Sequence, residues 1–278
     1  MEVIREIHEL KARQAVWNSP VGLVPTMGYL HEGHMALVRR ARQETATVVV
    51  TIFVNPTQFG PSEDFERYPR AFGRDLDLLR SAGVDIVFAP PVSEMYPDPF
   101  STWVEVEELG ELFEGVSRPG HFRGVATVCN KLFNLVSADR AYFGQKDAQQ
   151  VAIITKMVCD LNMKPDIVAI TTVREPDGLA MSSRNAYLNP QQRAAAAVLF
   201  RALNTACQLY RDGCRDVAMV TRAIADIVHE EHLAELDYAA VVDPTSFEEL
   251  DTLERPALAI LAVRIGTTRL IDNMLLKE

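Results

Sequence analysis

Residues 21–54 contain a short strand, a glycine turn, a helix and a second strand in succession, and this order most constrains the fold. Val21–Val24 is apolar, Glu32–Glu44 places apolar residues on or near one helical face, and Thr47–Val54 is a continuous run rich in β-branched residues. Such a run is typical of a strand that is covered on both faces in a parallel sheet. We therefore expect an α/β fold with a Rossmann-like parallel sheet.

The turn after the first strand holds Gly28, and the start of the helix holds His31, Gly33 and His34. A helix N-terminus presents unpaired N–H groups and the positive end of the helix dipole. Glycine lets the backbone approach a phosphate without a Cβ in the way. The two histidines are three residues apart, so they lie on one face of the first helical turn. This stretch predicts a site for a nucleotide triphosphate.

Two other interpretations of the histidine pair are open at this point. The pair could cap a surface helix without contacting a ligand. It could also bind zinc, but the histidines of the zinc-protease motif are four residues apart. Here they are three apart, with Gly33 inside the pair and no third ligand evident nearby.

The sequence pattern changes near Arg174, which predicts a domain boundary there. Up to that residue, apolar runs alternate with helical segments; beyond it lie a polar loop, two helices and three short strands around a turn at Gly266. We expect a Rossmann-like domain that binds the nucleotide over residues 1–174 and a smaller α+β domain over residues 175–278 that closes over the ligand. The further helices are expected over residues 1–17, 74–82, 125–136, 191–211 and 216–232, and the further strands over residues 84–89, 140–143, 167–173, 238–242, 257–263 and 268–273.

The composition limits the class of protein. The chain has 278 residues, 48% of them hydrophobic, which suffices for one large core or a core with a satellite. Its net charge of −10 argues against non-specific nucleic-acid binding, which needs a basic face. The apolar runs are too short to span a membrane, and the N-terminus lacks the apolar core of a signal peptide. Four cysteines without a C-x-x-C pair are typical of a reduced, cytoplasmic protein.

Polar side chains gather in the loops that follow the expected strands, and in open α/β sheets ligands bind at the carboxyl ends of strands. Asn55 and Gln58 are amides able to orient hydroxyl or carboxylate groups, although Asn-Pro also favours an ordinary turn. Asp75, which opens a helix, would hold Mg²⁺ through water or a phosphate, or would only cap that helix.

Two more loops carry cations and hydroxyls. Gly144–Asp147 places a glycine at a strand end and Lys146 at a helix start, with Gln150 one turn later. Lysine is a compact charge that suits a phosphate oxygen, whereas Asp147 could serve only the helix dipole. Met181–Arg184 offers two hydroxyls and a guanidinium on a segment able to close, or is a solvated loop.

This set of groups indicates nucleotidyl transfer. When a carboxylate or phosphate attacks the α-phosphorus of a nucleotide and pyrophosphate leaves, charge builds on the phosphoryl oxygens. Positioned N–H groups, lysine and protonated histidine lower that barrier. The order of residues reveals no Ser-His-Asp or Cys-His arrangement and no Walker A loop.

Six segments of the chain, in order, resemble the signature of the pantothenate synthetase (pantoate–β-alanine ligase) family. That family is part of a wide nucleotidyltransferase superfamily that shares the His-x-Gly-His motif, so the motif alone is moderately specific and the ordered set is highly specific. The C-terminal helices and strands fit the smaller domain of the family. The segments are PTMGYLHEGH (25–34), FVNPTQF (53–59), YPR (68–70), RPGHFRG (118–124), GQKD (144–147) and MSSRN (181–185).

The resemblance implies a ligase that joins (R)-pantoate to β-alanine, uses ATP and Mg²⁺, and releases AMP and pyrophosphate. It implies that the pantoate carboxylate first attacks ATP to give a bound pantoyl adenylate, and that the amine of β-alanine then displaces AMP. It also implies a cytoplasmic homodimer. His34 would be the proton donor with His31 beside the phosphates, and the implied catalytic set is completed by Lys146, Ser182 and Arg184.

The resemblance also assigns binding residues. Gln58 and Gln150 would hold pantoate, with Asn55 among the substrate-binding residues, and Asp75 would lie near the metal. The residues expected to bind ATP are Met27, Gly28, Tyr29, Leu30, His31, Glu32, Gly33, His34, Gly144, Gln145, Lys146, Asp147, Val173, Met181, Ser182, Ser183 and Arg184.

Two departures from the family pattern lie among the residues expected to bind ATP. Tyr29 stands where alanine is common, and Gln145 stands where glutamate is common. The missing negative charge beside Lys146 is expected to alter nucleotide affinity modestly. Neither departure removes a residue assigned to the chemistry.

Two competing functions make different demands on the sequence. Another nucleotidyltransferase, acting on a phosphorylated substrate, would need extra arginine or lysine in its substrate pocket, whereas the amides of Asn55, Gln58 and Gln150 favour hydroxyls and one carboxylate. A nucleotide-sensing protein without catalysis would not need the intact set that includes His34 and Lys146.

Overall fold

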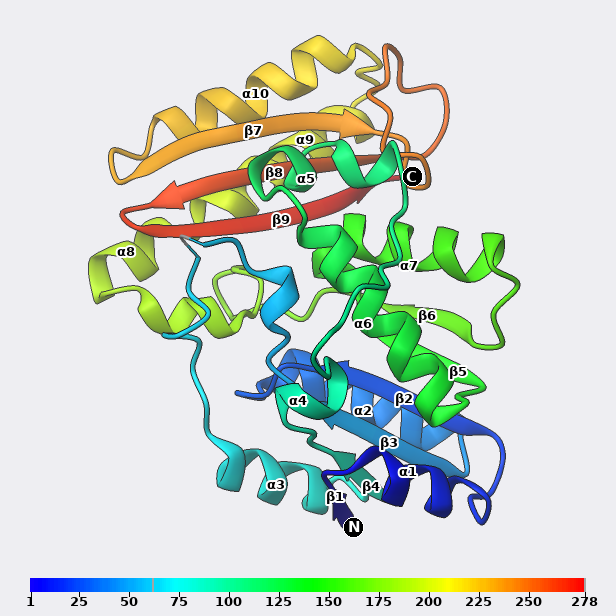
Figure 1. Cartoon of the computed structure of the whole chain (residues 1–278). Coiled ribbons are helices and arrows are strands. Elements are labelled where there is room, and N and C mark those ends of the chain that lie inside the picture. The colour runs from blue at the N-terminus through cyan, green and yellow to red at the C-terminus, as the bar shows by residue number, and fades with distance from the viewer. Residues whose placement is uncertain (62, 278) are drawn as a thin grey trace. The chain divides into compact units, whose positions relative to one another are not determined.

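The structure is a computed structural model that describes residues 1–61 and 63–277. The chain forms two compact units, and each is described by itself (Figure 1). The first unit comprises Met1–Gln145 and Gln149–Thr171, and the second comprises Lys146–Ala148 and Thr172–Glu278.

The first unit is built on a six-stranded sheet with the order β1-β4-β3-β2-β5-β6, in which every pair is parallel. The strand order reverses between β2 and β5, which is where open α/β sheets bind ligands. The strands are β1 Glu2–Ile4, β2 Val21–Thr26, β3 Thr47–Ile52, β4 Ile86–Phe88, β5 Arg140–Gly144 and β6 Asp166–Ile170. The α-helices are α1 Ile7–Gln14, α2 Glu32–Glu44, α3 Phe72–Ser81, α4 Val92–Met95, α5 Glu114–Ser117, α6 His121–Val136 and α7 Ala148–Asp160, and the 3₁₀ turns are η1 Pro56–Gln58 and η2 Leu109–Glu111. The 3₁₀ turn η3 Gln145–Asp147 lies between β5 and α7, and Lys146–Ala148 group with the second unit.

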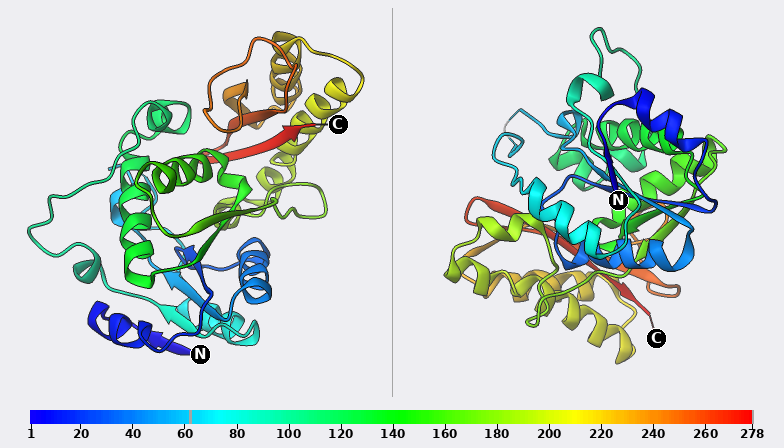
Figure 2. Two further views of the ribbon diagram at one scale, coloured as in Figure 1. Left: turned by 90° about the vertical axis from the view of Figure 1, so that its right-hand side faces the viewer. Right: turned by 90° about the horizontal axis from the view of Figure 1, so that it is seen from below.

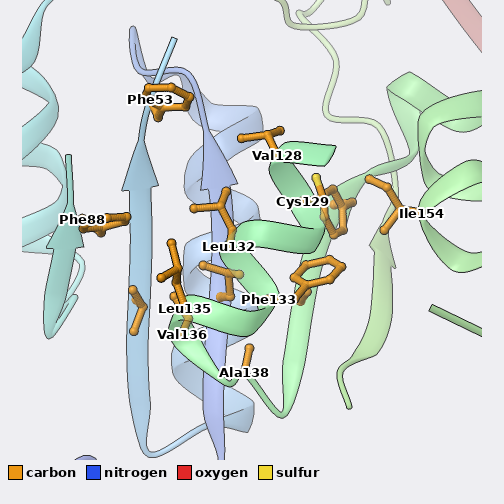
Figure 3. Packing of buried hydrophobic residues seen from close by; sticks show 14 of the residues in the cluster. Phe53, Phe88, Val128, Cys129, Leu132, Phe133, Leu135, Val136, Ala138 and Ile154 are labelled. Carbon is orange, nitrogen blue, oxygen red and sulfur yellow. The ribbon is translucent and has the colours of Figure 1, made fainter. Parts of the chain in front are cut away.

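Both faces of this sheet are covered, as the continuous apolar run of β3 predicts. Val49 points into one buried cluster with α1, α6 and α7, and its neighbours Val48 and Val50 point into another with α2 and α3, because successive strand residues face opposite sides. Figure 2 shows α6 and α2 on opposite sides of the strands. Figure 3 shows side chains of α6, among them Leu132 and Val136, directed at the sheet. Packing on both faces holds the loops at the strand ends on a rigid support.

Several predicted elements of the first unit are wrong in their bounds or type. Residues 1–17 are not one helix, because Glu2–Ile4 pairs parallel with Ile86–Phe88 as an edge strand and only Ile7–Gln14 is helical. The glycine-rich turn before the predicted helix over 125–136 is shorter than expected, since α6 already begins at His121. The last strand ends at Ile170 instead of continuing to Val173.

The second unit is a three-stranded antiparallel sheet, in the order β7-β8-β9, with α9 and α10 packed on it (Figure 1). The turn at Gly266 has a positive φ of 60° and joins β8 to β9, as predicted. The predicted helix over 191–211 is two helices, since hydrogen bonds between residues three apart interrupt it near Ala196 and Ala197. The elements are η4 Ser183–Tyr187, α8 Pro190–Ala195, α9 Val198–Arg211, α10 Val217–His229, β7 Ala234–Val242, β8 Ala257–Ile265 and β9 Thr268–Leu276.

Across residues 1–61 and 63–277, no helix combines the length and the apolar character that crossing a membrane requires.

Candidate active site

The turn between β2 and α2 is shaped by two residues with positive φ and held by an internal carboxylate. Gly28 has a φ of 84° and Tyr29 a φ of 51°. The buried Asp75 of α3 accepts a hydrogen bond from Tyr29 N at 2.8 Å with one oxygen and from Leu30 N at 2.9 Å with the other. The expected N–H groups are thus present before the helix, but Asp75 takes two of them and fixes the turn.

His31 and His34 cap α2 reciprocally, and this fixes the tautomer of both rings. His31 Nδ1 accepts from Gly33 N at 3.2 Å, and His34 Nδ1 accepts from His31 N at 3.3 Å. Because a backbone N–H can only donate, each neutral ring carries its proton on Nε2. The ring centroids are 4.0 Å apart, so the two histidines share one face, as predicted. The cap thus uses Nδ1 of both rings as an acceptor, and the predicted role of protonated histidine stays a prediction.

The loop after β3 brings Gln58 against the β2–α2 turn. Gln58 Nε2 lies 3.4 Å from Met27 Sδ, and Gln58 Oε1 accepts from Asn55 Nδ2 at 3.0 Å. Asn55 is 1% exposed and also bonds Gly124 O, Tyr96 Oη and Thr57. Asn55 therefore orients Gln58, and its predicted contact with substrate stays a prediction.

The main-chain carbonyl of Gln58 is held by a second set of side chains, which the sequence patterns did not predict. It accepts from His121 Nδ1 at 2.8 Å and from Arg118 Nη2 at 3.3 Å. Arg118 also forms a two-pronged ion pair with Glu63, at 2.7 and 2.8 Å. Both side chains belong to the Arg118-Pro-Gly-His121 segment, which the sequence shows as a glycine-rich turn. Their partner, the Gln58 carbonyl, lies some sixty positions earlier in the chain, so local patterns do not indicate the contact.

The environment of His121 predicts a pH effect on stability. Burial, together with the positive charge of Arg118, lowers the pKa of His121 from 6.5 to about 4, against the weaker opposing effects of Glu63 and Glu114. The unfolded state therefore takes up this proton first as the pH falls, so the stabilisation is complete above pH 6.5 and is lost progressively down to about pH 4.

We expect the wild-type protein to lose about 2 kcal/mol more unfolding free energy between pH 7 and pH 5 than a His121→Asn variant, which has nothing to protonate at this position. Urea unfolding curves at the two pH values measure the difference. Equal losses in the two proteins would contradict the buried neutral state of His121.

The hydrogen bonds of Asp75 argue against this carboxylate as a direct ligand of a metal ion. Both oxygens of this carboxylate already accept main-chain N–H bonds at a position that is 1% exposed. Within residues 1–61 and 63–277, the one cluster of three potential metal ligands is the exposed group Glu6, His8 and Glu9. A magnesium ion would thus take most of its oxygen ligands from water and from a bound triphosphate, as Mg²⁺ commonly does, and the role of Asp75 beside it stays a prediction.

Two of the residues predicted to bind ATP lie at the end of β5. Gly144 is the last residue of this strand, and Gln145 is the first residue of η3. Because β5 pairs parallel with β2, its carboxyl end lies at the same edge of the sheet as the Met27 turn. Gln150 lies in the first turn of α7 and is half-buried. Its predicted contact with pantoate stays a prediction.

The second unit contains the other predicted phosphate ligands. Lys146 Nζ lies 3.2 Å from Asp147 Oδ1. Val173 and Met181 face each other at the base of a hairpin-like loop, where Met181 N donates to Val173 O at 3.0 Å. Ser182 caps η4 by accepting from Arg184 N at 3.3 Å.

The structure therefore gathers the predicted residues in two sets. In the first unit it brings together the β2–α2 turn (Met27–His34), Asn55, Gln58 and Asp75. In the second unit, Lys146 and the loop with Ser182–Arg184 are both present. The first set places the His31–His34 pair and the Gln58 amide around one turn, an arrangement suited to holding phosphoryl oxygens beside a carboxylate.

Comparison with known proteins gives one consistent result. The sequence model of the family described as Pantoate-beta-alanine ligase matches residues 2–275. The chain is similar to the pantothenate synthetase of Roseiflexus castenholzii, at 57% identity over the whole of both chains. It is also similar to that of Acetivibrio thermocellus, at 53% identity over the whole of both.

Two solved structures resemble the fold over its whole length. One is pantothenate synthetase from Thermus thermophilus, with a TM-score of 0.96, 48% identity and complete coverage of both chains. The other is the pantoate-beta-alanine ligase from Francisella tularensis in complex with beta-gamma ATP and beta-alanine, with a TM-score of 0.83, 33% identity and coverage of 100% of this chain and 98% of that one. This chain belongs to the pantoate–β-alanine ligase family.

Proposed function

We propose that this protein condenses (R)-pantoate with β-alanine to form pantothenate at the expense of ATP, releasing AMP and pyrophosphate. Family membership over residues 2–275 supports the reaction, and the relative from Francisella tularensis binds both a form of ATP and β-alanine. The observation within this chain that supports it most is the 3.4 Å contact between Gln58 Nε2 and Met27 Sδ. It puts an amide suited to a carboxylate substrate directly beside the turn proposed to hold ATP.

In the first proposed step, a pantoate carboxylate oxygen attacks the α-phosphorus of ATP. A new oxygen–phosphorus bond forms, the bond to pyrophosphate breaks, and pantoyl adenylate remains bound. The Nε2–H groups of His31 and His34 donate to phosphoryl oxygens as charge develops, because their Nδ1 atoms are already engaged in the cap. Preorganised donors of this kind stabilise the transition state without reorganising.

In the second proposed step, the amine of β-alanine attacks the acyl carbon of the adenylate. The new carbon–nitrogen bond replaces the carbon–oxygen bond to AMP, and the amine loses a proton. AMP is a far better leaving group than the hydroxide of a free acid, which is why the carboxylate is activated first. We propose that the smaller domain, residues 175–278, closes on the domain formed by residues 1–174 and so excludes water from the adenylate.

Lys146, Ser182 and Arg184 are proposed to bind phosphates, together with the other predicted ATP ligands, and Gln58 and Gln150 are proposed to bind pantoate. Mg²⁺, when bound with ATP, neutralises phosphate charge. We further propose a cytoplasmic homodimer. The four cysteines are free, in keeping with a reducing compartment.

Incubation of the purified protein with ATP, Mg²⁺, pantoate and β-alanine tests the proposed function. Pantothenate, AMP and pyrophosphate should form in equal amounts, and omission of either organic substrate should abolish pantothenate. Formation of ADP and phosphate instead, or a complete lack of pantothenate, would contradict the proposal and favour another nucleotidyltransferase or a binding protein.

A further inference from the structure

Two consecutive residues of the last strand, Asp272 and Asn273 of β9, are buried and polar, with exposures of 3% and 6%. Burial of polar side chains is costly unless their hydrogen bonds are satisfied. Their partners lie in two segments far apart in sequence, at Lys146 and at Arg174. Both segments belong to the same compact unit as β9.

Asn273 holds the main chain at Lys146. Its Nδ2 donates to the Lys146 carbonyl oxygen at 2.9 Å. Although Lys146 follows β5 of the first unit in sequence, residues 146–148 group with the second unit. This hydrogen bond fixes the backbone from which the Lys146 side chain extends.

Asp272 holds the base of the loop that leads to Ser182. Its carboxylate receives two hydrogen bonds from the Arg174 guanidinium, at 2.6 and 3.0 Å. Arg174 also donates to Gly178 O at 3.0 Å and to Asn273 O at 3.3 Å, and its guanidinium lies 4.9 Å from the Phe200 ring centroid. Both terminal nitrogens of the guanidinium therefore make hydrogen bonds.

The loop itself is a closed hairpin, residues 173–181. Glu175 N donates to Leu179 O at 2.8 Å, and Met181 N donates to Val173 O at 3.0 Å. Arg174 crosses this hairpin from Asp272 to the Gly178 carbonyl, and a surface ion pair between Arg193 and Asp177 restrains its tip. The direction in which Ser182–Arg184 leaves the hairpin therefore depends on the Asp272–Arg174 pair.

We propose that Asp272 and Asn273 are positioning residues for ATP, which set the Lys146 backbone and the hairpin 173–181 from neighbouring places on one strand. The inference rests on the proposed function, in which Lys146 and Ser182–Arg184 bind the phosphates. Adjacent strand residues hold both segments, so the phosphate ligands of the second unit are arranged before ATP arrives. Such preorganisation reduces the entropy lost on binding.

Steady-state kinetics of Asn273→Ala and Asn273→Asp test the first half of the proposal. Aspartate preserves the shape of asparagine but places an acceptor against the Lys146 carbonyl. In both variants the KM for ATP should rise about tenfold, since a buried hydrogen bond is lost, while the KM values for pantoate and β-alanine stay unchanged. Leu275→Ala, at an exposed position of the same strand, should leave all three KM values unchanged.

Hydrogen exchange of the ligand-free protein tests the second half without any assay of activity. In Arg174→Lys the positive charge remains, but an ammonium cannot bridge Asp272 and Gly178 with a planar fork. The backbone amides of residues 175 and 177–181 should then exchange about tenfold faster than in the wild type, while those of β8 exchange as before.

The two possible failures can be told apart. If the wild-type protein makes pantothenate but the Asn273 variants keep the wild-type KM for ATP, or if all three KM values rise together, the positioning role is wrong and the function stands. Unchanged exchange in Arg174→Lys would also overturn the role of Asp272. If the wild-type protein makes no pantothenate, the proposed function itself fails, and the exchange result still decides whether β9 orders the hairpin.

Discussion

A His34→Ala variant should remain folded and lose most of its turnover, with kcat lower by about 10²–10³-fold, the usual effect of removing one preorganised donor to a developing oxyanion. The physical reason is the helix cap: because His34 Nδ1 accepts from His31 N, we expect this ring to donate to a phosphoryl oxygen from Nε2. Single-turnover measurements of adenylate formation would locate the loss in the first step.

His34 also stabilises its helix, and a second variant separates this contribution from catalysis. Glutamine is a natural residue at the third position of a capping box, where its side chain accepts from the N-cap N–H. His34→Gln should therefore restore most of the roughly 1 kcal/mol of stability that the alanine variant loses, without restoring kcat. Wild-type turnover in either variant would show that His34 does not take part in the chemistry.

A Gly124→Ala variant should be destabilised by about 1–3 kcal/mol, the range for overpacking a close contact, and should lose efficiency toward pantoate. An added Cβ would lie 2.3 Å from Thr57 O and 2.7 Å from Gln58 N. Helix α6 rests directly on η1 at this point, so the methyl group must push the Gln58 turn away. Thermal unfolding and kcat/KM for pantoate measure the two effects.

Gly73 in α3 is the matched control, because a Cβ there meets nothing within 4 Å. Gly73→Ala should leave stability unchanged or raise it by about 0.5–1 kcal/mol, since alanine favours the helix more than glycine does. If Gly124→Ala is as stable and as active as Gly73→Ala, the close packing of α6 on the Gln58 turn is not what positions Gln58.

Much of the fold could be predicted because local patterns determine it. The β-branched run of β3 predicts a strand buried on both faces, and Val48 and Val49 do lie in different clusters. The edge strand Glu2–Ile4 could not be predicted in the same way. It is three residues long and exists because it pairs with Ile86–Phe88, some eighty positions later, and no local periodicity carries that information.

The same distinction between local patterns and long-range contacts applies to the candidate site. The shared face of His31 and His34 follows from their spacing and is confirmed. The contacts that hold the site are long-range: Asp75 to the Tyr29 turn, His121 to Gln58, and Asn273 to Lys146. Each joins a buried polar side chain to a main-chain group on another element, and such pairs are fixed by the tertiary fold.

Pantoate is proposed to be activated by adenylation before β-alanine reacts, and exchange of labelled pyrophosphate into ATP tests this order most directly. With the wild-type protein, Mg²⁺ and pantoate, and with β-alanine absent, label should enter ATP, and the rate should fall in His34→Ala in parallel with kcat. If pantothenate forms in the complete mixture but label enters ATP only when β-alanine is added, the adenylate is not an independent intermediate and the claim is wrong.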